Sequence, residues 1–378
     1  MIFLIKNGNN KNMKKMYKYK INKPIMYSLF LFIIISIVSI YSASNLISNN
    51  LLVIKQVVWF IIGLFLIYLI TKVKNKNIYK HYKLLYIIGN ISLIALLLFA
   101  EPINNSKCWF NIFGIATIQP SEFMKIILII TNAMIIYENR NRKDYIIVLK
   151  VLLITLIPAI LTFLQPDTGM VIIYFIISFI MLFISGINRK WFTSTIFIVL
   201  LLLSLFLSLY FYNSDLFIKI FGTNFFYRID RLLDWKNGVG MQLTNALTGI
   251  GSAGLFGFGF NNTPIYFPEP QTDFIFSVFA INYGLIGCIF LLTLITYFDI
   301  NILKIGINVR SKVEKYIISG IFGMLLYQQI QNIGMNIGLL PITGITLPFI
   351  SYGGSSLLSY MIIIGLVLNI SNSRKNSL

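Results

Sequence analysis

The sequence from residue 25 to residue 70 decides the fold class: IMYSLFLFIIISIVSIYSAS (25–44) is followed, after a six-residue link, by LLVIKQVVWFIIGLFLIYLI (51–70). Each run is 20 residues long, and about 20 mainly apolar residues are what a helix needs to cross the hydrocarbon of a bilayer. The short link between the runs predicts two helices that cross a membrane in opposite directions. The bilayer is therefore expected to be part of the solvent of this chain.

Comparable apolar runs fill most of the remaining sequence: 84–100, 119–137, 145–164, 168–186, 191–212, 272–298, 315–335 and 350–371. Of the 378 residues, 57% are apolar and only 11% are charged, against about 25% charged residues in an average soluble domain. This composition excludes an ordinary soluble enzyme. The sequence predicts an all-α polytopic membrane protein of about ten transmembrane helices.

The distribution of charge predicts the orientation of these helices. The chain has 31 Lys and Arg; with the N-terminus inside, 23 of them fall in cytoplasmic segments and five in the opposite loops. Cytoplasmic loops of membrane proteins are enriched in Lys and Arg, so both termini are expected in the cytoplasm. A basic rim of this kind faces anionic lipid headgroups, and membrane lipids rather than nucleic acid are its expected partner. Eight of the 12 acidic residues lie on or near the outer face, where we expect any chemistry.

The chain divides into a basic cytoplasmic tail (1–24), a single membrane domain (25–371) and a short cytoplasmic tail (372–378). One connection is much longer than the others: residues 213–271 form an extracytoplasmic loop of mixed polar, aromatic and Gly-rich sequence. Loops of this length in compact proteins are usually functional or carry their own structure. Residues 240–247 could form a short helix at the membrane interface.

Several familiar chemistries are excluded. The single histidine, His81, lies in a basic loop, which removes Ser-His-Asp and Cys-His catalysis. Cys108 and Cys288 are far apart in the expected topology, so no disulfide is expected between them. Gly249-Ile-Gly-Ser-Ala-Gly254 matches GxGxxG, but no strand precedes it, so a dinucleotide site is not predicted. Its glycines allow close approach either to a ligand or to a neighbouring helix.

Ionisable residues at membrane depth carry the most information, because a charge in hydrocarbon is costly and usually functional. In Gln119-Pro-Ser-Glu122-Phe-Met-Lys125, the Glu and the Lys are three apart and share a helix face; the alternative to a functional pair is an internal ion pair that only joins helices. Asp167 lies at an outer span boundary, where helix capping alone could explain it.

Two further groups of charged residues lie on the outer side. Arg228 and Arg231, three apart in the long loop, suit a phosphate or carboxylate ligand, unless they form salt bridges with Asp230 or Asp234. Glu269 and Asp273 directly precede a long apolar span, at residues 272–298. A carboxylate at the mouth of a membrane cavity can have its pKa raised by desolvation and act as a general base.

At these residues the chain resembles the SEDS family (shape, elongation, division and sporulation), whose best-known members are RodA and FtsW. The strings that carry the resemblance occur in family order along the sequence: Tyr41-Ser-Ala-Ser44, Ile118-Gln-Pro-Ser-Glu-Phe-Met-Lys125, Gln165-Pro-Asp-Thr-Gly169, Gly251-Ser-Ala-Gly-Leu-Phe-Gly257, Pro268-Glu269, Thr272-Asp-Phe-Ile-Phe276, Tyr283-Gly-Leu-Ile-Gly287, Leu340-Pro-Ile-Thr-Gly344 and Leu347-Pro-Phe-Ile-Ser-Tyr-Gly-Gly-Ser355.

The resemblance implies a peptidoglycan glycosyltransferase of the bacterial cytoplasmic membrane. Such an enzyme polymerises lipid II into a nascent glycan strand at the outer face, releases undecaprenyl diphosphate, and works with a class B penicillin-binding protein in elongation, division or sporulation. It implies that Asp273 is the essential carboxylate. Conserved family positions match further residues of this chain: Glu122, Lys125, Asp167, Arg228, Arg231, Glu269 and the turn Ser351-Tyr-Gly-Gly354.

The chain departs from the family pattern where basic residues are usual. Cys108 replaces the Arg before Trp109, Thr117 replaces a basic residue two positions before the Gln-Pro-Ser-Glu string, and Gln271 replaces the His before Thr-Asp-Phe. A Glu-Glu pair that often precedes Gly-Leu-Ile-Gly is Asn282-Tyr283 here. The loss of basic groups leaves fewer cations to neutralise a diphosphate.

The expected mechanism is an inverting glycosyl transfer in which Asp273 accepts the proton of the attacking hydroxyl. Lys125, Arg228 and Arg231 are expected to neutralise the diphosphate, aided by a divalent cation (Mg²⁺ or Mn²⁺) if Glu122 or Asp167 binds one. Two rival functions stay open: a lipid II flippase, in which Glu122 and Lys125 would line a polar path, and a non-catalytic scaffold for the penicillin-binding protein. The sequence shows no broken helices or inverted repeats typical of transporters, which favours the enzyme.

Overall fold

The computed structural model describes residues 22–49, 51–102, 107–112, 116–223, 226 and 240–373. Its helices are α1 (Lys23–Leu46), α2 (Leu51–Lys72), α3 (Asn75–Lys80), α4 (Tyr82–Phe99), α5 (Pro120–Glu138), α6 (Asp144–Leu164), α7 (Thr168–Ile184), α8 (Arg189–Tyr212), α9 (Ser214–Phe221), α11 (Met241–Ser252), α12 (Ile275–Asn308), α13 (Lys312–Asn336) and α14 (Gly354–Ser373). The all-α prediction is confirmed, and a helix occupies each of the ten predicted apolar runs.

Eight helices of the described chain are long and apolar enough to cross a membrane: α1, α2, α4, α5, α6, α8, α12 and α14. Helix α7 is apolar but has only 17 residues. Helix α13 has 25 residues and is rich in amide side chains, which lower its mean hydropathy. Helices α7 and α13 pack against each other inside the bundle. Ten crossings, and the domain limits at residues 24 and 371, remain predictions.

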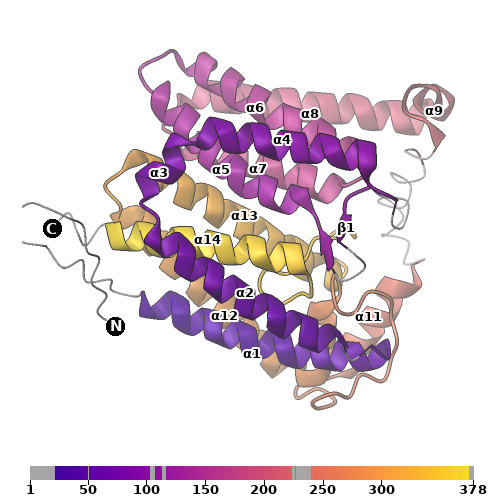
Figure 1. The fold of residues 1–378 in the computed structure, drawn as a ribbon. Coiled ribbons are helices and arrows are strands. Elements are labelled where there is room, and N and C mark those ends of the chain that lie inside the picture. The colour runs from indigo at the N-terminus through magenta and orange to yellow at the C-terminus, as the bar shows by residue number, and fades with distance from the viewer. Residues whose placement is uncertain are drawn as a thin grey trace, which may run out of the picture.

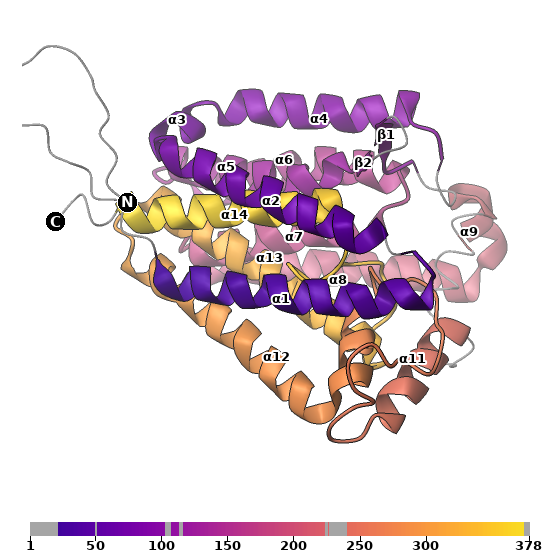
Figure 2. The ribbon, with the colours of Figure 1, turned by 60° about the horizontal axis from the view of Figure 1, so that its bottom comes forward.

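The long helices run side by side and divide the molecule into two ends (Figures 1 and 2). Helix α1 begins and α14 finishes at one end, where Asn22 Nδ2 donates to Ser371 Oγ at 3.2 Å. The opposite end, called the loop end below, carries β1, α9 and α11. The two ends of the described chain therefore lie on one side of the bundle, as the predicted topology requires. The prediction of a short helix in the long loop is confirmed by α11, which covers residues 241–252.

Glycines allow α2 and α14 to pack closely. A Cβ atom on Gly63 would lie 2.5 Å from Met361 Cγ, and one on Gly365 would lie 3.0 Å from Ile70 Cβ. Small residues at helix contacts are typical of membrane bundles, where van der Waals packing rather than hydrophobic burial drives association. Helix α14 is thereby fixed against α2, and the loop before α14 is fixed with it.

Helix α12 is broken at Gly284, which has φ +61° and ψ −160°. The backbone groups around the break bond to the loop after α11: Leu285 N donates to Gly254 O at 3.1 Å, and Phe258 N donates to Ile281 O at 2.9 Å. The sequence-based expectation that no helix is broken is therefore wrong. The Gly-rich segment after residue 249 approaches a neighbouring helix, because a Cβ on Gly257 would lie 2.4 Å from Asn282 O. The break lies near the loop end of α12, and its exposed backbone groups are satisfied within the protein.

The predicted limits of two spans need correction. Helix α12 continues to Asn308, ten residues beyond the expected end, because a helix that has left the hydrocarbon can continue with polar residues. Asp299 lies within this longer helix, where it is buried and accepts a hydrogen bond from Gln329 Nε2 at 3.2 Å. Helix α14 begins at Gly354, since the residues before it form turns that contribute to the site described next.

A two-stranded antiparallel hairpin precedes α5, with β1 (Phe110–Ile112) paired to β2 (Ala116–Ile118) and Phe110 opposite Ile118. No strand was expected here from the sequence. Its β-branched residues Ile112, Thr117 and Ile118 were the available signal. The hairpin leads into Gln119, whose backbone N–H donates to Ser355 Oγ at 2.9 Å. It thus joins the start of α5 to the start of α14.

Candidate functional site

Asp273 lies at the loop end, two residues before α12 begins. A turn precedes it, in which Phe274 N donates to Glu269 O at 3.3 Å. The side chain is half-buried, and its carboxylate accepts no hydrogen bond from the described residues. A Cβ on Gly344 would lie 3.6 Å from Asp273 Oδ2, and Gly344 itself is exposed with φ +69°. The carboxylate therefore lies beside an accessible backbone turn that has no side chain.

Two effects raise the pKa of Asp273 to about 7: burial, which is the larger, and the negative charge of Glu269. Glu269 is exposed, and its Oε2 accepts hydrogen bonds from Thr272 Oγ1 at 2.9 Å and Gln271 Nε2 at 3.0 Å. A carboxyl group with a pKa near neutrality can both take up and release a proton at cellular pH. Asp273 is thus suited to general-base chemistry.

The loop between α13 and α14 clamps the chain just before Asp273. Ser351 Oγ donates to Thr272 O at 2.6 Å and accepts from Leu347 N at 2.8 Å, while Tyr352 N donates to Gln271 O at 2.8 Å. The Ser351-Tyr-Gly-Gly354 turn, assigned to the site only by resemblance, therefore contacts the segment that carries Asp273. The side chain of Gln271 bonds Glu269 instead of providing a cation.

Glu122 and Lys125 form an ion pair of 2.5 Å inside the bundle. Lys125 is 0% and Glu122 4% exposed. Ser359 Oγ donates to Glu122 Oε2 at 3.1 Å, and Lys125 Nζ lies 4.3 Å from the centre of the Tyr360 ring. Ser359 and Tyr360 belong to α14, so the ion pair joins α5 to α14. This geometry favours the internal ion pair over a direct ligand role, because both charged groups are buried and paired with each other.

Asp167 caps the N-terminus of α7. Its Oδ1 accepts from Met170 N at 3.2 Å, and its Oδ2 accepts from Gln119 Nε2 at 2.8 Å and Ser121 Oγ at 3.3 Å. Burial raises the pKa of Asp167 to about 6 despite these donors. The capping alternative for Asp167 is therefore what the structure supports, and the carboxylate also ties α7 to the start of α5.

The Asp167 and Asp273 regions meet at one loop. A Cβ on Gly169 would lie 2.9 Å from Thr343 O, and the next residue along, Gly344, faces Asp273. The loop between α13 and α14 thus lies between the cap of α7 and the start of α12. The predicted site residues Asp167, Glu269 and Asp273 are brought to one end of the bundle.

Arg228 and Arg231 lie outside the described residues, as do Asp230 and Asp234, so their predicted roles remain predictions. The described residues contain no group of three His, Cys, Asp or Glu side chains suited to a metal ion. The carboxylates predicted to hold a divalent cation do not suit it: Glu122 is neutralised by Lys125, and both Asp167 oxygens accept protein donors.

Cys108 and Cys288 are both free thiols, as expected. Cys108, where the family usually has an Arg, is buried, and its Sγ donates to Gln165 O at 2.9 Å.

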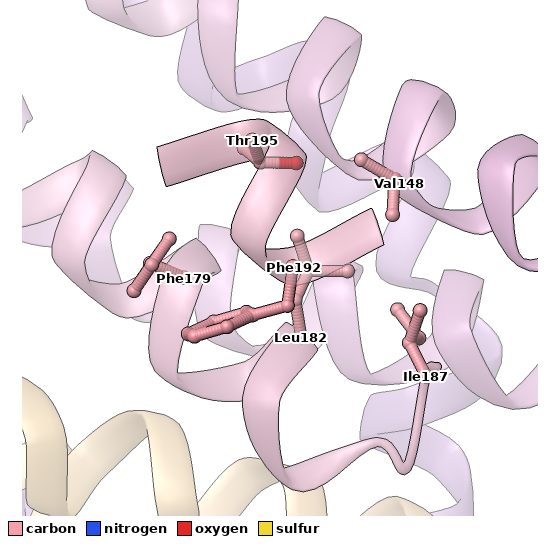
Figure 3. Close-up of a pocket in the computed structure, with 6 residues that line it drawn as sticks. All are labelled: Val148, Phe179, Leu182, Ile187, Phe192 and Thr195. Atoms are coloured by element: carbon pink, nitrogen blue, oxygen red, sulfur yellow. The ribbon is translucent and has the colours of Figure 1, made fainter. Parts of the chain in front are cut away.

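A separate hollow lies between α6, α7 and α8 and is lined by Val148, Phe179, Leu182, Ile187, Phe192 and Thr195 (Figure 3). Its lining contains no ionisable side chain, and only the Thr195 hydroxyl is polar. It therefore offers nothing for acid-base chemistry.

Fold and site define a polytopic helical membrane protein with a half-buried carboxylate, that of Asp273, at the loop end of its bundle. The chain belongs to the FtsW/RodA/SpoVE family, since the family model described as "Cell cycle protein" matches residues 21–376. It is accordingly a multi-pass protein of the bacterial cytoplasmic membrane.

Similar proteins span nearly the whole chain. The probable peptidoglycan glycosyltransferase FtsW of Bacillus subtilis is 30% identical over 378 residues, covering 96% of this chain and 92% of that protein. Stage V sporulation protein E of the same organism is 32% identical over 282 residues, covering 71% and 72%. Among solved structures, a chain from a peptidoglycan synthase complex that coordinates polymerization and crosslinking superposes with a TM-score of 0.79 at 25% identity, covering 94% and 98%. An aspartate-to-alanine mutant of RodA from Thermus thermophilus superposes with a TM-score of 0.70 at 25% identity, covering 94% and 98%.

Proposed function

We propose that this protein is a peptidoglycan glycosyltransferase that polymerises lipid II at the outer face of the cytoplasmic membrane. The observation that carries the proposal is the Asp273 carboxylate: it lies at the loop end beside the exposed Gly344 turn, with its pKa raised to about 7. Curated relatives that match nearly the full chain bear the name peptidoglycan glycosyltransferase, which supports this reaction class.

In the proposed reaction Asp273 acts as the general base. It accepts the proton of the C4 hydroxyl of the acceptor GlcNAc as that oxygen attacks C1 of the donor MurNAc. The new C1–O4 bond forms while the bond between C1 and the phosphate oxygen breaks, and its electron pair leaves with undecaprenyl diphosphate. One carboxylate suffices because the diphosphate needs charge neutralisation more than a proton. Attack opposite the leaving group converts the α-linked donor into a β-1,4 linkage.

Cations must stabilise the departing diphosphate. Arg228 and Arg231 are the proposed ligands, because paired guanidinium groups match phosphate oxygens. Lys125 is buried in its ion pair and would act only indirectly, by holding α5 against α14. A divalent cation such as Mg²⁺ or Mn²⁺ would supply further positive charge, although Glu122 and Asp167, the carboxylates expected to hold it, do not suit it.

A penicillin-binding protein is the proposed partner. The solved chain that superposes with a TM-score of 0.79 comes from a complex that coordinates polymerization and crosslinking. A glycan strand made at the outer face needs a transpeptidase there. We propose a class B penicillin-binding protein in this role.

Polymerisation of labelled lipid II by the purified protein in detergent, alone and with a cognate transpeptidase, tests the proposal. Glycan strands are expected from the wild type and none from Asp273→Asn. A flippase would give no polymer in detergent, because no bilayer separates two pools of substrate. A scaffold would give none either, and its Asp273→Asn variant would complement a deletion strain. Either result would overturn the proposed function.

A further inference from the structure

Two buried amide side chains of α13 hold the main chain of Asp273. Asn332 Nδ2 and Asn336 Nδ2 each donate to the carbonyl oxygen of Asp273 at 2.9 Å, and both asparagines are 0% exposed. They are four residues apart, so they lie on one face of the helix. One carbonyl oxygen thus receives two donors from a neighbouring helix.

Asn336 also completes the N-terminus of α12. The residue at the N-cap position is Phe274, which offers no side-chain oxygen to the free N–H groups of the first turn. Asn336 Oδ1 takes that role, accepting from Ser277 N at 3.0 Å and from Ser277 Oγ at 2.5 Å. The cap of α12 therefore comes from α13, and its amide nitrogen holds Asp273 at the same time.

Asn332 connects Asp273 to the turn opposite its carboxylate. Besides its bond to Asp273 O, Asn332 Nδ2 donates to Ile345 O at 2.8 Å. Ile345 follows Gly344, on which a Cβ would lie 3.6 Å from Asp273 Oδ2. One amide group therefore fixes the separation between the carboxylate and the turn it faces.

We infer that Asn332 and Asn336 are positioning residues for Asp273, which hold its main chain so that the carboxylate stays beside the Gly344 turn. This inference rests on the proposed function. Neither side chain is exposed, and each bonds main-chain atoms of Asp273 rather than its carboxylate, so neither is a catalytic residue. A displacement of about 1 Å at a reacting group can cost about 100-fold in rate, which is why such anchoring matters.

Steady-state polymerisation kinetics of Asn336→Ala and Asn332→Ala test the inference. We expect kcat to fall about 10- to 100-fold, with KM for lipid II within about twofold of the wild type. The acid limb of the rate–pH profile should move to lower pH, because a carboxylate that is no longer held in place gains water. Asn332→Ala leaves the Asn336 cap of α12 intact, so it stays informative if Asn336→Ala fails to fold.

Asn132→Ala is the matched control. Asn132 is also 0% exposed and also joins two helices, since its Nδ2 donates to Ser178 Oγ at 2.9 Å, but neither residue belongs to α12 or α13. The control should lose thermal stability without a change in kcat or in the acid limb. Equal effects of Asn132→Ala and Asn332→Ala on kcat, or an unmoved acid limb in the α13 variants, would overturn the inference alone. A wild type without polymerase activity would overturn the proposed function and this inference with it.

Discussion

The substitution Glu269→Gln removes one negative charge near Asp273 and should therefore shift the pH dependence of the reaction to lower pH. Burial is the larger cause of the raised pKa of Asp273, and the Glu269 carboxylate is the second. Glutamine keeps a side-chain oxygen to accept from Thr272 and Gln271, so the local turn should survive. Removing the negative charge makes the ionised form of Asp273 less unfavourable. Its pKa should therefore fall, although burial keeps it above the value of an exposed carboxyl.

The size of the effect follows from the ionised fraction of the base. With a pKa of about 7, Asp273 is ionised in about one molecule in ten at pH 6 and about nine in ten at pH 8, so the wild-type rate should rise about tenfold over this interval. In Glu269→Gln a larger fraction is ionised at pH 6. The ratio of the two rates should consequently fall from about ten towards one.

Initial rates of lipid II polymerisation at constant ionic strength, from about pH 5.5 to about pH 8.5, measure this ratio. Asp215→Asn is the control, since Asp215 is an exposed acidic residue of α9 and its removal changes the net charge equally. Its profile should match the wild type. A wild-type rate that does not vary between pH 6 and pH 8, or a Glu269→Gln acid limb at unchanged or higher pH, would refute the assignment of Asp273 as the base.

Three further outcomes are expected. Gly284→Ala should lower the free energy of unfolding by about 3 kcal/mol or more, because of backbone strain and displaced hydrogen bonds. In the control Gly251→Ala in α11 a Cβ meets no atom within 4 Å, so the free energy of unfolding should stay unchanged or rise by up to about 1 kcal/mol. Equal melting temperatures of the two variants in detergent would contradict this prediction. Lys125→Ala should cost about 3–5 kcal/mol by leaving Glu122 buried without its partner, and the double variant Glu122→Gln/Lys125→Met should recover stability and activity together if the pair is structural. Chelation of divalent cations should reduce the rate of polymerisation and added Mg²⁺ or Mn²⁺ should restore it, and a rate that chelator leaves unchanged would exclude the proposed cation.

The helices could be predicted because the hydrocarbon of a bilayer demands long apolar runs, and such runs are visible without any knowledge of packing. The same criterion could not reveal the break in α12. Apart from Asn282, the residues on both sides of Gly284 are mainly apolar, so the apolar run continues across it. The signal was the combination of this glycine with the Gly-rich segment at 251–259, since each requires the other to approach closely. That pairing is a tertiary contact and has no periodicity in sequence.

The site likewise has a part that the sequence predicts and a part that depends on tertiary contacts. Resemblance assigned Asp273 as the essential carboxylate, but its supports lie 59 and 63 residues away on α13. Asn332 and Asn336 are uncharged, so the criterion of an ionisable residue at membrane depth does not select them. Both are polar residues within an apolar run, and this is the signal in the sequence, because a buried amide in a membrane must find partners.

Glu122 and Lys125 illustrate how a costly charge in hydrocarbon can be functional without touching a substrate. Their charges neutralise each other, and Ser359 and Tyr360 bind the pair from α14. Helix α14 in turn begins directly after the turn whose Ser351 holds the carbonyl of Thr272, next to Asp273. Loss of the ion pair would therefore change the position of α14 and, through Ser351, the position of the segment that carries Asp273. Sensitivity of activity to substitutions at Glu122 or Lys125 is thus expected from the packing alone, and only the charge-neutral double variant can separate this effect from direct binding of the diphosphate.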